Sequence, residues 1–211
     1  MKNSIAYKYD SRAWYFGLYD ILFFYPLRFR ARGADALGDV AGKRVLEIGC
    51  GSGLNFKYLV ERVGSAGAVR GIDISERMIA VAQTRCDRNL WNNAFAELAD
   101  AAEYHARTQF DAVYFGLSFT VLRDPRKVLD NILEQLRPGG RLVVLETRIP
   151  EWIPGFARKW VAEYAHRTFG TSPDIEPWGI FEEYECRGVL KNIHIETVRH
   201  YSFYVLSAEK A

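Results

Sequence analysis

Short apolar runs alternate with segments of helical spacing from residue 44 to residue 147. "RVLEIG" precedes a helical pattern over residues 54–63, and "AVRGIDI" precedes another over residues 75–86. "FDAVYFG" leads to Asp124 and Pro125, a helix cap followed by proline, and that helix is expected to end at "RPGG" before the strand "RLVVLE". Strands that alternate with helices form a mostly parallel sheet, so the pattern predicts a doubly wound α/β fold.

Two weaker patterns complete the expected sheet. "NAFAELAD" is placed as the third strand because its neighbours alternate, although its alanines and glutamate also suit a helix. The tail "NIHIETVRHYSFYVLSAEK" carries apolar residues at every second position, and "RHYS" within it can turn. This spacing predicts two antiparallel strands that close one edge of the sheet.

Composition limits the class of protein. A chain of 211 residues, 49% of them hydrophobic, can bury one core, so a single domain is expected. The net charge of +2 gives no strong field, and nucleic acid is not expected as a partner. The three cysteines show neither disulfide nor zinc spacing, which favours a reduced chain, a cytoplasmic location and no bound metal. No apolar run approaches the ~20 residues that span a bilayer.

A glycine loop, "GCGSG", lies between the first strand and the first helix. Such a corner offers free backbone N–H groups and the positive end of a helix dipole. The spacing is not that of a dinucleotide site, because Leu54 or Phe56 stands where the third glycine belongs, and no P-loop lysine follows. Glu47 would repel a phosphate but attract an ammonium, directly or through water. A zwitterion therefore fits this loop.

Two acids at later strand ends extend the expected ligand. Asp73 ends the second strand, where a carboxylate can accept hydrogen bonds from both ribose hydroxyls. Asp100 and Ala101 follow the third strand, where they can accept from an adenine amino group and donate to the ring. A ligand with amino-acid, ribose and adenine parts is S-adenosylmethionine. The structural alternatives are that Asp73 caps a helix and that Asp100 is an ordinary exposed acid.

In chain order, "VLEIGCGSG", "GIDISERMI", "LADAAE" and "LRPGGRLVVLE" resemble the motifs of class I S-adenosylmethionine-dependent methyltransferases. "YDSRAWYFGLYD" resembles the N-terminal segment of members that methylate quinones or phospholipids, where a tyrosine closes over the cofactor. The resemblance implies a Rossmann-like, mostly parallel seven-stranded sheet with an antiparallel edge strand and an N-terminal helical lid. No family histidine follows "FDAVYFG", so no catalytic residue is carried over. The candidate cofactor-binding residues are Tyr9, Tyr15, Glu47, Gly49, Gly51, Gly53, Asp73, Ile74, Met78, Asp100, Ala101 and Gly116.

The expected single domain, residues 1–211, has four parts: an aromatic lid at 1–40, a cofactor-binding core at 41–147, a substrate-side insertion at 148–180 and C-terminal strands at 181–211. The aromatic lid and insertion predict a hydrophobic small-molecule acceptor, a lipid amine or a quinone-like ring. A polar secondary metabolite, or a non-catalytic cofactor-binding or scaffold role, is the alternative. Arginines beside the aromatic run of the lid also allow a peripheral membrane contact.

Within the insertion, residues 156–169 have the pattern of an amphipathic helix. Trp160, Val161, Tyr164 and Ala165 fall on one side of it. We expect this helix to pack on its own domain.

Overall fold

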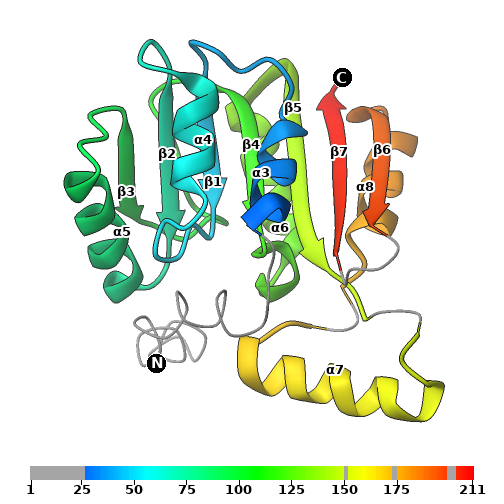
Figure 1. Ribbon diagram of the computed structural model, residues 1–211. Helices are drawn as coiled ribbons and strands as arrows, with labels where there is room; N and C mark the ends of the chain where they lie inside the picture. Colours follow the sequence, from blue (N-terminus) through cyan, green and yellow to red (C-terminus); the bar gives the residue numbers. More distant parts are fainter. Residues whose placement is uncertain (1–26, 150–151, 173–174, 199–202) are drawn as a thin grey trace.

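The computed structural model describes residues 27–149, 152–172, 175–198 and 203–211. Seven strands form one sheet in the order β3-β2-β1-β4-β5-β7-β6 (Figure 1). The strands are β1 (Arg44–Ile48), β2 (Ala68–Asp73), β3 (Ala94–Leu98), β4 (Phe110–Gly116), β5 (Leu136–Thr147), β6 (Leu190–Val198) and β7 (Phe203–Lys210). The expected Rossmann-like, mostly parallel sheet is confirmed.

Helices cover both faces of this sheet (Figure 1). The helices of the described residues are α3 (Leu27–Asp35), α4 (Phe56–Val63), α5 (Glu76–Arg88), α6 (Pro125–Gln135), α7 (Gly155–Phe169) and α8 (Pro177–Cys186), with a 3-10 helix η1 (Phe119–Val121). Apolar side chains of α3, α4 and α5 pack against one face of the sheet, in a cluster that includes Phe56 and Tyr114. Side chains of α6 and α8 pack against the other face, in a cluster that includes Leu129 and Phe181.

The edge formed by the C-terminal strands agrees with the alternating pattern of the tail. β7 pairs antiparallel with both β5 and β6, so an antiparallel pair closes this edge of the sheet. The turn expected at residues 199–202 lies outside the described residues. Residues 1–26 of the expected lid also lie outside them. The uncertain third strand is confirmed as β3, which pairs in parallel with β2.

Two residues that the sequence indicates as helix caps make capping hydrogen bonds in the structure. The Ser75 hydroxyl accepts a hydrogen bond from the Met78 N–H at 3.2 Å at the start of α5. Asp124 Oδ1 accepts from the Lys127 N–H at 3.0 Å at the start of α6, where Pro125 occupies the first position. The ends of β2 and β4 are therefore followed by helices that begin at fixed residues.

The helix α7 lies beyond the carboxyl ends of the parallel strands (Figure 1). The expected helix is confirmed, and one side of it borders the cavity of its own domain, but it does not pack into the core, because none of its residues is buried. Trp160 is 79% exposed, whereas Val161 and Ala165 line a cavity. The side of α7 that faces the domain thus borders the cavity, and Trp160 points away from it.

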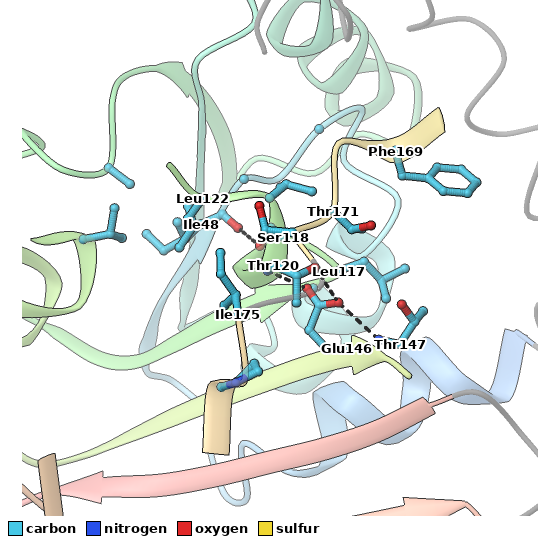
Figure 2. A pocket seen from close by; sticks show the side chains of 18 of the residues that line it. Ile48, Leu117, Ser118, Thr120, Leu122, Glu146, Thr147, Phe169, Thr171 and Ile175 are labelled. Carbon is cyan, nitrogen blue, oxygen red and sulfur yellow. Dashed lines mark hydrogen bonds between the residues drawn. The ribbon is translucent and has the colours of Figure 1, made fainter. Parts of the chain in front are cut away.

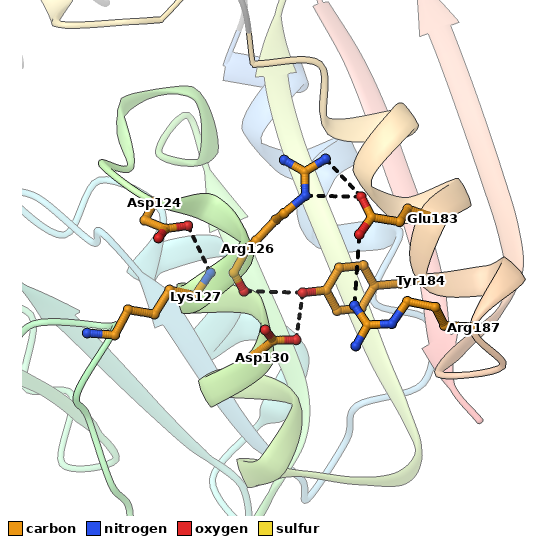
Figure 3. A network of polar contacts seen from close by, with 7 residues as sticks. All are labelled: Asp124, Arg126, Lys127, Asp130, Glu183, Tyr184 and Arg187. Atoms are coloured by element: carbon orange, nitrogen blue, oxygen red, sulfur yellow. Dashed lines mark hydrogen bonds and ion pairs between the residues drawn. The ribbon is translucent and has the colours of Figure 1, made fainter.

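A polar network joins α8 to α6 (Figure 3). The Arg126 guanidinium donates twice to Glu183 Oε2, at 2.8 and 3.0 Å. The Tyr184 hydroxyl donates to Asp130 Oδ1 at 2.6 Å, and burial raises the pKa of this phenol to about 12. The network fixes the position of α8, whose first turn carries Trp178 to the cavity.

Candidate functional site

A cavity of about 1070 Å³ opens at the carboxyl ends of β1, β2, β4 and β5. In the sheet order, β1 lies between β2 and β4, so the chain crosses over in opposite directions on the two sides of this point. Ligands of doubly wound folds bind at such a reversal. The glycine loop forms one end of the cavity, and α7, α8 and the start of β7 form the other.

Most of the sequence-predicted site residues meet at this cavity. Glu47 and Gly53 are buried and do not line it, and Tyr9 and Tyr15 lie outside the described residues. The predicted site residues that do line the cavity are Gly49, Gly51, Asp73, Ile74, Met78, Asp100, Ala101 and Gly116.

The glycine loop needs glycine for its backbone conformation. Gly49, Gly51 and Gly53 have φ values of +65°, +53° and +73°, in the left-handed region. A Cβ at Gly49 would lie 2.6 Å from the Cβ of Ser118, whereas a Cβ at Gly51 would meet no atom within 4 Å. Gly49 therefore allows close packing, and the backbone at Gly51 faces open space.

Asp73 joins the glycine loop to the start of α5. Its Oδ2 accepts a hydrogen bond from the Gly51 N–H at 2.9 Å, and its Oδ1 accepts from the Ser75 N–H at 2.9 Å. Ser75, and not Asp73, is the N-cap residue of α5. Each carboxylate oxygen can accept two hydrogen bonds, so these two N–H donors do not by themselves fill the carboxylate.

Glu47 reaches the cavity only through a neighbour. Its carboxylate is fully buried, and its Oε1 accepts from Asn55 Nδ2 at 2.6 Å. Asn55 Oδ1 in turn accepts from Arg30 Nη1 at 2.7 Å, and both Asn55 and Arg30 line the cavity. Glu47 Oε2 has no hydrogen-bond partner within the described part of the chain. Burial raises the pKa of Glu47 to about 8, against the lowering effects of Asn55 and Arg30.

Sequence reasoning missed Asn55 and Arg30. Asn55 directly precedes α4, and an asparagine at that position resembles a helix cap, yet its side chain makes no capping bond and turns to Glu47. Arg30 lies in α3, 25 residues from Asn55, so only the folded chain brings the two together. The signal for Asn55 was its place two residues after Gly53, the last glycine of the loop.

Glu146 is a second buried acid at the cavity. It is 1% exposed and lies near the carboxyl end of β5, among apolar side chains such as Ile175 (Figure 2). Its Oε1 accepts from the Thr120 N–H at 3.2 Å, and its Oε2 accepts from the Thr120 hydroxyl at 3.2 Å and the Thr147 N–H at 3.1 Å. Burial raises the pKa of Glu146 to about 7 despite these bonds. The signal in the sequence was an acid at the end of a buried apolar strand.

The far end of the cavity has aromatic walls. Trp178 of α8 packs edge to face on Tyr204 of β7, with ring centroids 5.9 Å apart. At the opposite end, Asp100 is exposed and its Oδ1 accepts from the Ala102 N–H at 2.9 Å.

Within the described ranges, no group of three or more His, Cys, Asp or Glu residues could hold a metal ion. No helix in these ranges is long and apolar enough to cross a membrane.

Known proteins resemble this chain in sequence and in fold. A methyltransferase domain family matches residues 39–191. Demethylmenaquinone methyltransferase of Thermus thermophilus is 34% identical over 69% of this chain and 64% of its own length. The chloroplastic 2-phytyl-1,4-beta-naphthoquinone methyltransferase of Arabidopsis thaliana is 27% identical over 76% of this chain and 64% of its own length. The chain spans about half to two thirds of the length of the curated relatives it matches.

The fold has relatives among solved structures. Phosphoethanolamine N-methyltransferase 2 of Haemonchus contortus, in complex with S-adenosyl-L-methionine, superposes with a TM-score of 0.71 at 18% identity, over 87% of this chain and 52% of that protein. At this identity the likeness concerns the fold alone. With the family match, the ordered motifs and the cavity at the glycine loop, the chain belongs to the class I S-adenosylmethionine-dependent methyltransferases.

Proposed function

We propose that this protein transfers a methyl group from S-adenosylmethionine to a hydrophobic small molecule with a quinone-like ring. The observation that carries the proposal is the single cavity that joins the glycine loop and Asp73 to the aromatic walls at Trp178 and Tyr204. Relatives named as demethylmenaquinone and naphthoquinone methyltransferases support this acceptor class. A lipid amine ranks second, because the neighbours named as N-methyltransferases are at most 20% identical to this chain, where the likeness concerns the fold alone.

The residues around the glycine loop fit S-adenosylmethionine. Open space at Gly51 leaves room for the carboxylate beside the glycine loop, although the Gly51 N–H itself donates to Asp73. Asp73 would accept hydrogen bonds from the ribose hydroxyls. Glu47, one oxygen of which has no partner among the described residues, lies behind Asn55. A positive charge bound nearby would favour its ionised form and lower its raised pKa. Asp100 and Ala101 would receive the adenine. When bound, the cofactor supplies a methyl group on a sulfonium that carries its own leaving group.

The protein's own contribution is alignment and the exclusion of water. Displacement at a methyl carbon needs donor and acceptor in line, and it gains from a dry cavity. Leu122, Ile175 and Trp178 give the acceptor end an apolar lining. These side chains would hold a flat apolar ring against the open end of the cofactor site.

We expect calorimetry to give micromolar binding of S-adenosylmethionine and S-adenosylhomocysteine, roughly −7 to −8 kcal/mol. Methyl-labelled cofactor should then label a short-chain naphthohydroquinone in preference to phosphatidylethanolamine or a polar catechol. Tighter binding of NAD than of either sulfur compound would overturn the cofactor assignment. Binding without label in any acceptor would favour the scaffold alternative.

We also propose that α7 contacts an anionic membrane surface, from which a hydrophobic acceptor would enter. Phe156, Trp160 and Tyr164 follow one another at intervals of four residues and are 83%, 79% and 56% exposed. Lys159 and Arg167 lie on the same helix, and Glu163 is its only acid. An aromatic stripe with basic neighbours suits the headgroup region of a bilayer. Tyr164 at the end of the stripe also lines the cavity, beside Val161 and Ala165.

The Phe156→Ala/Trp160→Ala double variant is expected to bind phosphatidylglycerol vesicles at least ~10-fold more weakly in a flotation assay, because it loses most of the stripe's apolar area. Methylation of a water-soluble acceptor should be retained. The matched control is Phe95→Ala/Leu98→Ala. These side chains are 45% and 53% exposed, and they lie on β3, an edge strand of the sheet, and not on α7. Equal vesicle binding by both double variants, or equal binding to neutral vesicles, would contradict the proposal.

A further inference from the structure

We infer that Glu146 is a catalytic residue, which accepts a hydrogen bond from a hydroxyl of the methyl acceptor and takes its proton during transfer. The inference rests on the proposed function and adds to it a residue and a requirement: the acceptor is a phenol or hydroquinone with a free hydroxyl. Sequence analysis assigned no residue to this role. Four features of the structure support it.

The first feature is the position of Glu146 in the sheet. Asp73 ends β2 and Glu146 lies near the end of β5, and β1 and β4 lie between these two strands. Three strand spacings separate the two carboxylates by about 14 Å across the carboxyl edge. The ribose site and Glu146 therefore occupy different parts of the cavity, and Glu146 belongs to the part where the acceptor would lie.

The second feature is that Glu146 is held in place by a fixed set of donors. Both of its oxygens accept from Thr120 or from the backbone at Thr147, so the carboxyl group has one orientation at the cavity wall (Figure 2). Oε1 accepts from the Thr120 N–H at 3.2 Å, and the Phe119 backbone also stabilises the charged carboxylate. Since each carboxylate oxygen can accept two hydrogen bonds, a donor from the acceptor can be added at Oε1. A hydroxyl of the acceptor can supply that donor, whereas a carbonyl oxygen of an oxidised ring cannot.

The third feature is the set of groups around this carboxyl. Tyr204 of β7 has a phenol pKa raised mainly by burial and further by the charge of Glu146, so it stays neutral. Tyr114 of β4 packs in the cluster on the other face of the sheet, and its pKa is raised mainly by burial and then by Glu47, with Glu146 the smallest contribution. Glu176, before α8, acts on Tyr204 in the same direction. Arg148 follows β5 and also lines the cavity. Among these surroundings, burial holds the pKa of Glu146 near 7, where a carboxylate can take up a proton at neutral pH.

The fourth feature is the shape and character of the neighbouring walls. Leu117, Leu122 and Ile175 lie around Glu146 with Phe169 farther out, and the hydroxyls of Thr120, Thr147 and Thr171 lie in the same part of the cavity (Figure 2). Glu146 is the carboxyl group among these side chains. A buried carboxylate beside apolar side chains favours a ring with a matching hydroxyl, because a ring without one gains no hydrogen bond to Oε1.

The protons and electron pairs of the methyl-transfer step balance. The hydroxyl proton passes to Glu146, the released electron pair forms the bond to the methyl carbon, and the bond from methyl to sulfur breaks with its electrons kept by sulfur. Where a ring carbon takes the methyl group, that carbon later loses its own proton and the hydroxyl is restored. Either route releases one proton overall.

The test compares Glu146→Gln and Glu146→Asp with the unchanged protein, using labelled S-adenosylmethionine and a short-chain naphthohydroquinone from pH 5.5 to 9. We expect kcat of Glu146→Gln to fall by ~100-fold or more, while calorimetric affinity for S-adenosylhomocysteine changes less than about 2-fold. The unchanged protein should gain activity as the pH rises through about 7, the pKa of Glu146, and the glutamine variant should lose that rise. Glu146→Asp should recover part of the rate. Glu134→Gln, an exposed acid on α6, is the control.

Two results separate failure of this inference from failure of the proposed function. If the unchanged protein methylates the hydroquinone and Glu146→Gln keeps its rate and its pH profile, Glu146 is not the proton acceptor. If the unchanged protein instead labels only phosphatidylethanolamine, the quinone-like acceptor is wrong, and the inference falls with it. A thermal melt of each variant shows whether a lost rate reflects unfolding, and the aspartate variant then decides the question.

Discussion

Replacing Asp73 by alanine is expected to weaken S-adenosylmethionine binding by about 30-fold or more, equivalent to ~2 kcal/mol. The physical reason is twofold. The ribose hydroxyls lose a charged acceptor. The Gly51 N–H also loses its hydrogen bond to Asp73 Oδ2, which is 2.9 Å long in the unchanged protein. Calorimetry with S-adenosylmethionine measures the change directly.

The matched variants for this prediction are Asp73→Asn and Ser75→Ala. An asparagine side chain has one acceptor oxygen, but the Gly51 and Ser75 N–H groups both donate to Asp73, so one of them loses its partner. Asp73→Asn should therefore lose affinity and about 1–3 kcal/mol of stability. Ser75→Ala removes only the helix cap and should cost about 1 kcal/mol of stability, with affinity largely kept. Unchanged affinity in both Asp73 variants would return Asp73 to a structural role.

Glu47→Gln is expected to stabilise the ligand-free protein at alkaline pH and to weaken cofactor binding. The pKa of Glu47 is raised from 4.5 to about 8 by burial, so the folded state favours the protonated form. Stability from this group is fully present below pH 4.5 and is lost as the pH rises through about 8, by roughly 3–5 kcal/mol in all. Glutamine keeps an acceptor for Asn55 and carries no charge, so this loss disappears.

Urea unfolding at pH 5 and pH 9 measures the effect. The variant should match the unchanged protein at pH 5 and exceed it at pH 9, and Glu146, present in both, cancels from the difference. Cofactor affinity should fall by about 10-fold, less than for Asp73→Ala, because Glu47 acts through Asn55. A stability difference that is the same at both pH values would show that the buried charge is not its cause.

The sequence by itself determined the parts of this protein that depend on neighbouring residues. The alternation of strand and helix patterns specified the parallel sheet, and its antiparallel edge followed from the period of the tail. Ser75 and Asp124 marked helix starts, because a cap bonds to an N–H three residues away. The glycine loop and Asp73 could be joined into one site, since the carboxyl ends of neighbouring parallel strands meet at one edge.

Only the tertiary structure decided how Glu47 and Glu146 are placed relative to the cavity. Arg30 and Asn55 separate Glu47 from it, and Glu146 bonds to Thr120, 26 residues away. The exposure of Trp160 on α7 was also unpredictable, because a helical pattern gives the spacing of side chains and not the surface they meet. Contacts between residues distant in the chain depend on how whole elements pack, and the pKa values of both buried acids follow from that packing.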